Sequence, residues 1–281
     1  MIRLFVDHLT VIDCSLLDAQ RGLLGESWIV DLELSGALDE QGMIFDFAEV
    51  KKRIKAHIDQ CVDHCLLVPC RSPRYTCDGD TRQLTYRSEL GEITHSGPAQ
   101  AVCELDTENI TATAVEQHLM QLLQADMPAN VSGFSLHLRH EDDVGAPRYQ
   151  YSHGLKLHAG NCQRIAHGHR SRIEVWRSGK PAPDLGSQLA ASLDGRYVGN
   201  RSDIVARPQH DGVRYVNFAY QAPSGEFRLS LPEERCYLID TDSTAENIAQ
   251  HLAATLHAQD SGNQYRVKAW EGVDKGAIGE A

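Results

Sequence analysis

The alternation of apolar and polar residues divides the chain into short strands and a few amphipathic helices. Between residues 46 and 62, apolar side chains recur at the spacing of one helix face: Phe47, Val50, Ile54, Ile58 and Val62. Alternating stretches at 134–139 and 265–270 are typical of half-buried strands. Gly-containing turns near Gly91 and Gly225 each join two further stretches into a strand pair. This pattern predicts an α+β fold with antiparallel sheets.

One segment of the chain occurs twice. Residues 103–119 align without gaps to residues 236–252, and both segments begin with Cys and end with His-Leu. In each copy a Thr precedes an amphipathic run, so each predicts a capped helix. The repeat therefore predicts two diverged copies of one unit. The charged stretch 141–147, which ends in Gly and Pro, places the first copy at 1–145 and the second at 146–281.

Charge and composition narrow the class of protein. The net charge is -12 and the chain has no Lys/Arg-rich run, which argues against nucleic acid as a partner. No segment reaches 18 uninterrupted apolar residues and the start has no signal-peptide pattern, so we expect no membrane span and a cytoplasmic location. The eight cysteines include no Cys-x2-Cys pair, which favours reduced thiols over disulfides or a structural zinc knuckle.

The most specific local pattern is His-Gly-His at 167–169, at the start of an alternating stretch. Residues two apart on a strand point to the same face, so His167 and His169 can reach one metal ion. A third imidazole would complete a catalytic zinc site and leave the fourth position open. His153, on the preceding strand-like segment, is one candidate for this third ligand, and His158 is the other.

These residues together resemble the signature of the 6-pyruvoyl-tetrahydropterin synthase and 6-carboxytetrahydropterin synthase family. The resemblance covers Tyr-Ser-His at 151–153, Cys162 and His-Gly-His at 167–169. It implies zinc ligands at His153, His167 and His169 and a catalytic thiol at Cys162. It also implies two tandem T-fold units, with helices on one face of each sheet, that assemble into a barrel as a homo-oligomer.

The first copy resembles the family in a complementary way. It has Gly-Met-x-x-Asp-Phe at 42–47, and Asp63-His64 matches the pair that completes a triad with the Cys in the family. We expect His8 to occupy the place of the strand ligand, but Leu24-Gly-Glu26 replaces His-Gly-His, so this copy should have lost its metal. Residues 202–240 of the second copy contain no Asp-His element. The resemblance thus implies one composite site, formed either within a chain or between chains.

The resemblance also implies a pterin-binding surface. Glu271 matches the Glu that anchors the pterin ring on the last strand of the family, where a carboxylate can accept two hydrogen bonds. Thr244 and Glu246 match a helix start of the family, although Thr244 also fits a helix cap. Three nearby basic residues could bind a triphosphate: Arg164, Arg170 and Arg172.

The implied activity is that of a zinc-dependent lyase acting on 7,8-dihydroneopterin triphosphate. The expected product is 6-carboxy-5,6,7,8-tetrahydropterin, on the route to queuosine and other deazapurines. Elimination of triphosphate to the 6-pyruvoyl compound is an alternative. A second alternative is a non-catalytic relative that binds a pterin or purine or regulates a partner.

Overall fold

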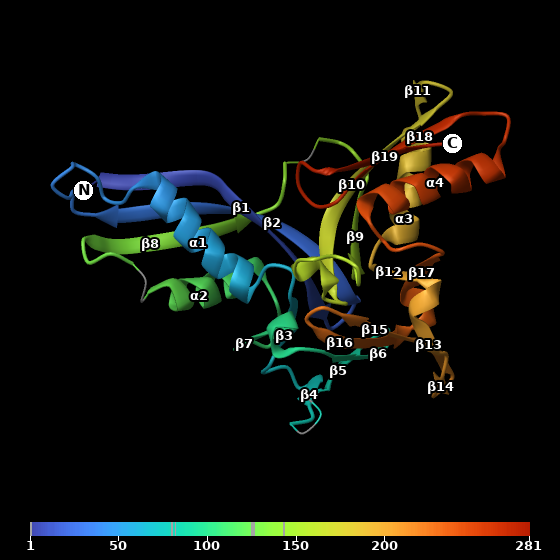
Figure 1. Cartoon of the computed structure of the whole chain (residues 1–281), viewed down its shortest axis with the longest axis horizontal. Coiled ribbons are helices and arrows are strands. Elements are labelled where there is room, and N and C mark those ends of the chain that lie inside the picture. The colour runs from blue at the N-terminus through green and yellow to red at the C-terminus, as the bar shows by residue number, and fades with distance from the viewer. Residues whose placement is uncertain (1, 80, 82, 125–126, 143) are drawn as a thin grey trace.

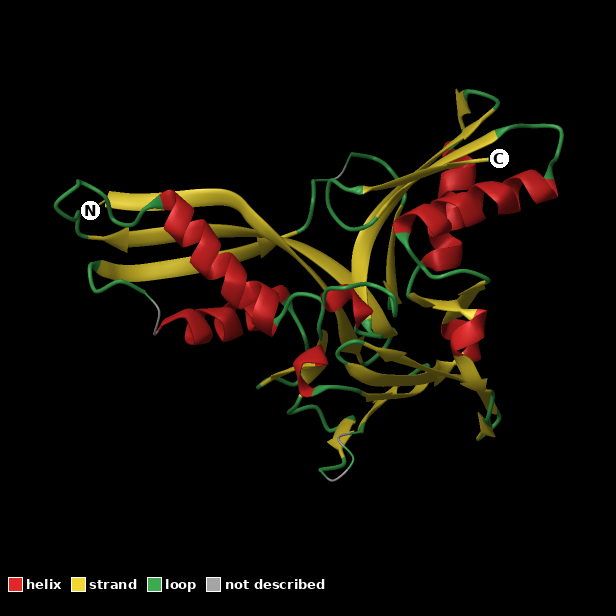
Figure 2. Cartoon of the chain, in the orientation of Figure 1, coloured by secondary structure: helices red, strands yellow, loops and turns green. Residues whose placement is uncertain are grey.

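The first sheet and its two helices come from the first half of the chain (Figure 1). The computed structural model describes all residues except 1, 80, 82, 125–126 and 143. The strand order is β7-β3-β1-β2-β8. The strands are β1 Ile2–Asp18, β2 Gly22–Gly36, β3 Leu66–Pro69, β7 Val102–Leu105 and β8 Val131–Arg139. Helices α1 Phe47–Cys61 and α2 Ala112–Leu123 lie along one side of the sheet (Figure 2).

The second half of the chain repeats this arrangement. Its strand order is β17-β12-β9-β10-β18-β19, with β11 on β10. The strands are β9 Arg148–His153, β10 His167–Arg177, β11 Lys180–Pro181, β12 Arg196–Asn200, β17 Cys236–Ile239, β18 Tyr265–Trp270 and β19 Gly276–Glu280. Its helices are α3 Pro183–Leu193 and α4 Ala245–Gln259. The last strand, β19, pairs along the outer edge of β18.

A third sheet contains strands from both halves, in the order β13-β15-β16-β6-β5-β4. The strands are β4 Tyr75–Cys77, β5 Leu84–Ser88, β6 Gly91–Ser96, β13 Ile204–Ala206, β15 Val213–Ala222 and β16 Gly225–Pro232, and β14 Gln209–His210 pairs with β15. Among the residues that the structure describes, short 3-10 helices lie at Ala99–Ala101, Asn161–Gln163, Arg201–Asp203 and Glu233–Arg235. Strand β16 pairs with β6, so this sheet joins the two halves.

The Thr caps predicted for the two repeated helices are confirmed, and α1 has an Asp cap that was not predicted. Asp46 accepts hydrogen bonds from the backbone of the first turn of α1, and Thr111 and Thr244 do the same for α2 and α4. Helix α3 was not predicted. It begins at Pro183, a residue that is favoured at the first helical position, but it has no side-chain cap of the kind that marks α1, α2 and α4. None of the helices in the described part of the chain is long and apolar enough to span a membrane.

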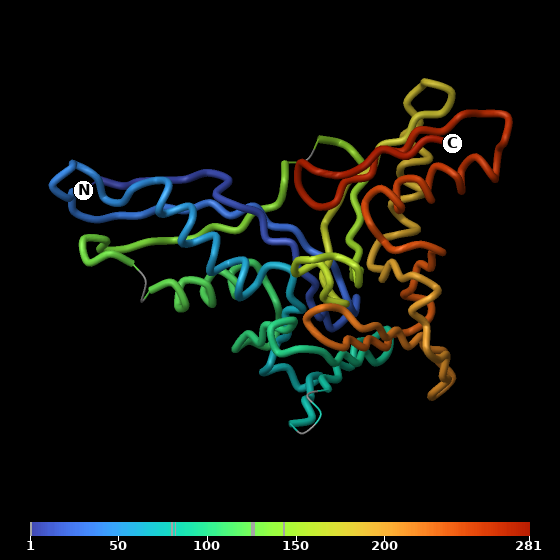
Figure 3. The backbone as a smooth tube through the Cα atoms, viewed as in Figure 1, coloured from blue at the N-terminus to red at the C-terminus, as the bar shows by residue number. Residues whose placement is uncertain are grey.

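The two halves meet where the β1–β2 hairpin crosses β9 and β10, near the centre of the molecule (Figure 3). Two glycines allow the close approach. A Cβ on Gly25 would lie 1.8 Å from the carbonyl oxygen of Tyr151, and one on Gly168 would lie 2.7 Å from the Cα of Gly25. The Ser15 and Ser152 hydroxyls bond across the crossing at 2.7 Å. Each half also has its own apolar core, and a third cluster is shared. The division at residues 145 and 146 stays a prediction.

His95 on β6 faces this shared core and gives a pH-dependent prediction. It is 2% exposed, and neither ring nitrogen has a hydrogen-bond partner among the described residues. Burial lowers its pKa to about 4, so the unfolded chain binds the proton more tightly than the folded chain. Protonation of His95 therefore does not reduce the free energy of unfolding above the unfolded pKa of about 6.5. Between pH 6.5 and 4 it lowers this free energy by up to about 1.4 kcal/mol per pH unit.

The substitution His95→Leu should remove this part of the pH dependence, because the cross-strand neighbours Leu84 and Leu229 can pack around a leucine. Urea unfolding at pH 7 and pH 4.5 measures the effect, with the exposed His210→Leu as control. An equal loss of stability on acidification in wild type and His95→Leu would contradict the assignment.

Candidate metal centre and acid-base pair

Three buried imidazoles converge where β9 ends and β10 begins. His153 pairs with His167 in the register of these strands, and His169 follows two residues later on the same face. Their candidate ligand atoms lie within 4.8 Å of one another. The Nε2 atoms of His153 and His169 are 3.1 Å apart, close to the roughly 3.3 Å separating two nitrogens on one tetrahedral zinc ion. His158 is exposed and its Nδ1 accepts from the Gly160 backbone, so it lies outside this cluster.

The contacts of the three Nδ1 atoms explain why the Nε2 atoms point toward one another. Nδ1 of His153 lies 2.9 Å from the Ser243 carbonyl oxygen, and Nδ1 of His167 lies 2.9 Å from that of Arg164. Nδ1 of His169 lies 3.1 Å from a carboxylate oxygen of Asp13. With a proton on each Nδ1, each Nε2 presents a lone pair to the centre.

The protonation and surroundings of the rings fit a metal ion. Burial, together with the neighbouring imidazoles, holds the pKa of His153 and of His167 well below the usual value, so both rings are neutral. The Nε2 of His167 is buried and has no hydrogen-bond partner among the described residues. Three buried imidazoles, two with a hydrogen-bonded Nδ1 and one with its Nδ1 beside a carboxylate, are a donor set that suits zinc and leaves a position open for a further ligand.

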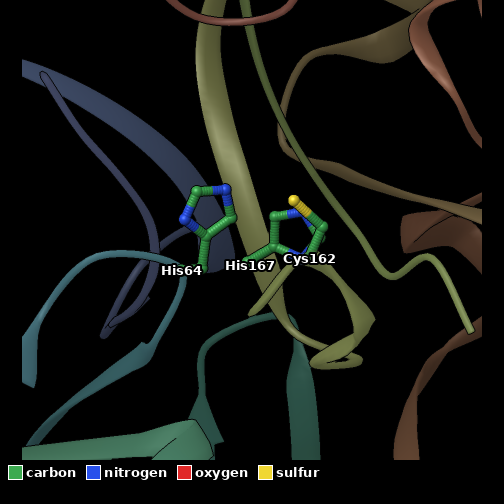
Figure 4. Close-up of side chains that lie close together, drawn as sticks. All are labelled: His64, Cys162 and His167. Carbon is green, nitrogen blue, oxygen red and sulfur yellow. The ribbon is translucent and has the colours of Figure 1, made fainter. Parts of the chain in front are cut away.

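A second group lies against this cluster: His64, Cys162 and His167 (Figure 4). His64 hydrogen-bonds Asp63 through Nδ1 at 2.6 Å, and its ring has a nitrogen within 4.8 Å of the Cys162 sulfur. Burial lowers the pKa of His64, but the hydrogen bond to Asp63 and the nearby Cys162 outweigh this effect and raise the pKa to about 10. The ring of His64 stands 5.1 Å from that of His167, centroid to centroid. An imidazolium thus lies between a carboxylate and a thiol, directly beside the histidine cluster.

The two parts of the site come from different halves of one chain. Asp63 and His64 follow α1 in the first half, and Cys162 lies in the 3-10 helix before β10 in the second. The structure therefore brings the residues together within a single chain. Their roles stay predictions.

The predicted pterin-binding residues differ in their position. The Oε1 atom of Glu271, at the end of β18, lies 3.9 Å from Nε2 of His153 and 3.8 Å from Nε2 of His169, and its side chain is 22% exposed. Thr244 accepts a hydrogen bond from the Asn247 backbone as the cap of α4. Glu246 is exposed on the first turn of that helix. Of the three, Glu271 is the residue that faces the histidine cluster.

Two of the three arginines proposed for the triphosphate are engaged inside the protein. Arg164 is 5% exposed and donates to the Asp63 carbonyl at 3.1 Å and to the Cys65 sulfur at 2.9 Å. Arg172 pairs with Glu141 at 3.0 Å and lies over the Trp270 ring. The expectation was wrong for these two residues because it used proximity in sequence alone.

The register corrects the prediction for His8. In the first half Leu16 pairs with Leu24 as His153 pairs with His167, so Leu16 occupies the place of the strand ligand. His8 is an exposed residue at an irregularity of β1 with a φ of 51°. Glu26 stands where the second half has His169. The first half has therefore lost all three imidazoles of the cluster.

The second half has an Asp-containing turn that sequence reasoning missed. Leu193-Asp194-Gly195 ends α3 as Val62-Asp63-His64 ends α1, and Gly195 shares the positive φ of His64. The carboxylate of Asp194 accepts from the Gln150 backbone, as that of Asp63 accepts from the Asp13 backbone. The signal was the Asp after the helix, but α3 itself was not predicted.

Leu16, Leu24 and Glu26 are the counterparts of the three histidines, and we call this group the vacated centre. The first half also lacks the thiol beside it. Ala19-Gln-Arg before Leu24 stands where the second half has Cys162-Gln-Arg before His167. The carboxylate of Glu26 lies 3.2 Å from Nε2 of His140, which occupies the place of Glu271. A carboxylate thus stands in the position of a metal ligand, and an imidazole stands in the position of the anchor carboxylate.

The paired antiparallel sheets, with helices on one face of each half, define a protein of two tandem T-fold units. A family model for 6-pyruvoyl tetrahydropterin synthase matches residues 17–127 and 146–280, and the chain belongs to this family. Members of this family are lyases of the tetrahydropterin synthase type.

Two solved structures illustrate the similarity. The 6-pyruvoyl tetrahydropterin synthase of Plasmodium falciparum shares 15% identity over 50% of this chain and 98% of its own, with a TM-score of 0.40. That of Plasmodium vivax shares 17% identity over 49% of this chain and 97% of its own, also with a TM-score of 0.40. No curated protein matches the chain.

Proposed function

We propose that this chain is a zinc-dependent lyase that converts 7,8-dihydroneopterin triphosphate to 6-carboxy-5,6,7,8-tetrahydropterin. The observation that carries the proposal is the position of the His64 ring and the Cys162 thiol within 4.8 Å of each other, directly beside a cluster of three buried imidazoles. The acid-base pair lies next to residues that could hold a metal ion, as proton transfer on a metal-bound substrate would require.

His153, His167 and His169 would hold the zinc ion. The ion, when bound, polarises the hydroxyl groups of the substrate side chain and makes neighbouring protons easier to remove. Cys162 would take a proton from the side chain as the thiolate, which the imidazolium of His64 stabilises. Asp63 keeps the His64 ring in place through the 2.6 Å bond to Nδ1.

Substrate orientation would depend on Glu271. Its carboxylate lies within 4 Å of two candidate ligands and can accept two hydrogen bonds from the amino group and adjacent N–H of a pterin. Thr244 and Glu246 remain proposed substrate contacts on α4. We further propose a cytoplasmic homo-oligomer with the two copies at 1–145 and 146–281.

Product analysis tests the proposal. Purified protein with zinc is incubated with 7,8-dihydroneopterin triphosphate, and products are separated by chromatography and mass spectrometry. The 6-carboxy product requires release of both triphosphate and a two-carbon aldehyde. Triphosphate without the aldehyde would indicate the 6-pyruvoyl product. Binding of the pterin without any turnover would contradict the proposal and favour a non-catalytic relative.

Zinc content gives a further expected result. Because the first half has Leu16, Leu24 and Glu26 at the positions of the three ligands, we expect one zinc ion per chain and not two. The substitution His153→Ala should leave less than a tenth of this zinc after dialysis, while His158→Ala should retain it. Elemental analysis against protein concentration measures both. Full zinc content in His153→Ala would exclude this cluster as the metal site.

A further inference from the structure

Asp13 lies at the meeting point of the two halves and its carboxylate contacts the second. It belongs to β1 of the first half and is 3% exposed. One carboxylate oxygen lies 3.1 Å from Nδ1 of His169 and accepts from the Ser27 hydroxyl at 2.6 Å. The other accepts from the Lys275 ammonium at 2.9 Å. The carboxylate is therefore the outer support of a candidate metal ligand from the opposite half.

The backbone of Asp13 supports the acid-base pair. Its N–H donates to a carboxylate oxygen of Asp63 at 2.9 Å, and its carbonyl accepts from the His64 N–H at 2.6 Å. His64 has a φ of 56°, a left-handed conformation that non-glycine residues seldom adopt. These two bonds hold the turn in that conformation.

The loop after β18 closes on the same carboxylate. Gly272 directly follows Glu271 and has a φ of 72°, and a Cβ there would lie 2.5 Å from the Asp13 carboxylate oxygen. Lys275 belongs to the same loop, and its carbonyl accepts from the Glu271 backbone at 3.0 Å. The position of the proposed pterin anchor thus depends on the space around Asp13.

We propose that Asp13 is a positioning residue that aligns the histidine cluster, the acid-base turn and the anchor loop across the seam between the two copies. The proposal rests on the zinc function proposed above. A carboxylate beside Nδ1 of His169 keeps the proton on that nitrogen and leaves Nε2 free to bind a metal.

Gln150 provides a matched control, because it makes the corresponding hydrogen bonds beside the vacated centre. Its backbone N–H donates to Asp194 at 2.9 Å and its carbonyl accepts from Gly195 at 2.7 Å. Its side chain donates to Glu26 at 3.2 Å and is 7% exposed as a residue. A purely structural role for Asp13 would make the two positions equivalent in every measurement.

The experiment compares the full-length wild type with Asp13→Asn, Asp13→Ala and Gln150→Ala. Zinc affinity is measured by competition with a chromophoric chelator, and folding by thermal unfolding of the zinc-free chains. We expect Asp13→Asn to weaken zinc affinity by about 10- to 100-fold, as is usual for an outer partner of a ligand. Gln150→Ala should leave zinc affinity within about twofold of wild type.

Each outcome decides the matter. Zinc binding by Asp13→Asn as tight as that of wild type overturns the inference alone, whereas a wild type that binds no zinc overturns the proposed function and the inference with it. If the Asp13 variants fail to fold, Ser27→Ala removes the 2.6 Å donor to the same carboxylate and leaves the charge in place. A several-fold loss of zinc affinity in Ser27→Ala then supports the inference, and unchanged affinity overturns it.

Discussion

Replacement of Cys162 by Ala should reduce turnover of 7,8-dihydroneopterin triphosphate by about 1,000-fold or more, because removal of a positioned acid-base group typically costs 100- to 10,000-fold. Cys162 lies beside His64 but is not one of the three proposed zinc ligands, so the variant should keep its zinc. Asp63→Asn should lose about 100-fold, since the amide cannot replace both bonds that the carboxylate accepts. Steady-state kinetics with zinc analysis of the same samples measures both effects.

The exposed thiol of Cys77 is the control for this series. Cys77→Ala should turn over substrate at the wild-type rate, and its thermal unfolding should match that of Cys162→Ala. If Cys162→Ala kept more than about a tenth of the activity, the thiol would have no catalytic role and the acid-base chemistry would have to be assigned to His64 alone.

Replacement of Gly25 by Ala should destabilise the fold by at least about 3 kcal/mol and yield little soluble protein. The added methyl group would lie 1.8 Å from the Tyr151 carbonyl oxygen and 2.4 Å from the His169 backbone nitrogen. Both contacts involve backbone, so no side-chain rotation can relieve them, and overpacking of this severity exceeds the usual cost of 1–3 kcal/mol. Urea unfolding or soluble yield at a fixed temperature measures the loss.

Gly262 is the control for this prediction. A Cβ there would meet one atom of Asp260 at 3.5 Å, an ordinary contact, and the residue is exposed. Gly262→Ala should therefore stay within about 0.5 kcal/mol of wild type. A folded Gly25→Ala chain of normal stability would show that the two sheets can separate at their crossing without cost.

The repeated elements could be predicted from the sequence because their signals are local. The caps at Thr111 and Thr244 and the turn at Gly225 depend on neighbours a few residues away. Convergence of His153 with the His-Gly-His pair followed from strand periodicity together with the family resemblance.

The features that the sequence did not predict depend on contacts between residues that are distant in the chain. Assignment of Leu16 in place of His8 required the strand register, which shifts between Val6 and Thr10. The interface role of Asp13 and the buried environment of Arg164 arise only when the β1–β2 hairpin crosses β9 and β10. No local pattern distinguishes such residues from other charged positions on a strand.

A site with a single copy of the unit must use the same positions both for packing and for metal binding. In this chain the vacated centre serves packing alone. Leu16 and Leu24 are 6% and 4% exposed in the apolar core of the first half, where shape and hydrophobicity alone restrict their replacement. Their counterparts His153 and His167 bury polar rings, which lowers stability, as is common for residues of a functional site. At Leu16 and Leu24 the first half is therefore open to any apolar side chain that fills the same space, while Asp13, Asp63 and His64 of the same half remain tied to the proposed site.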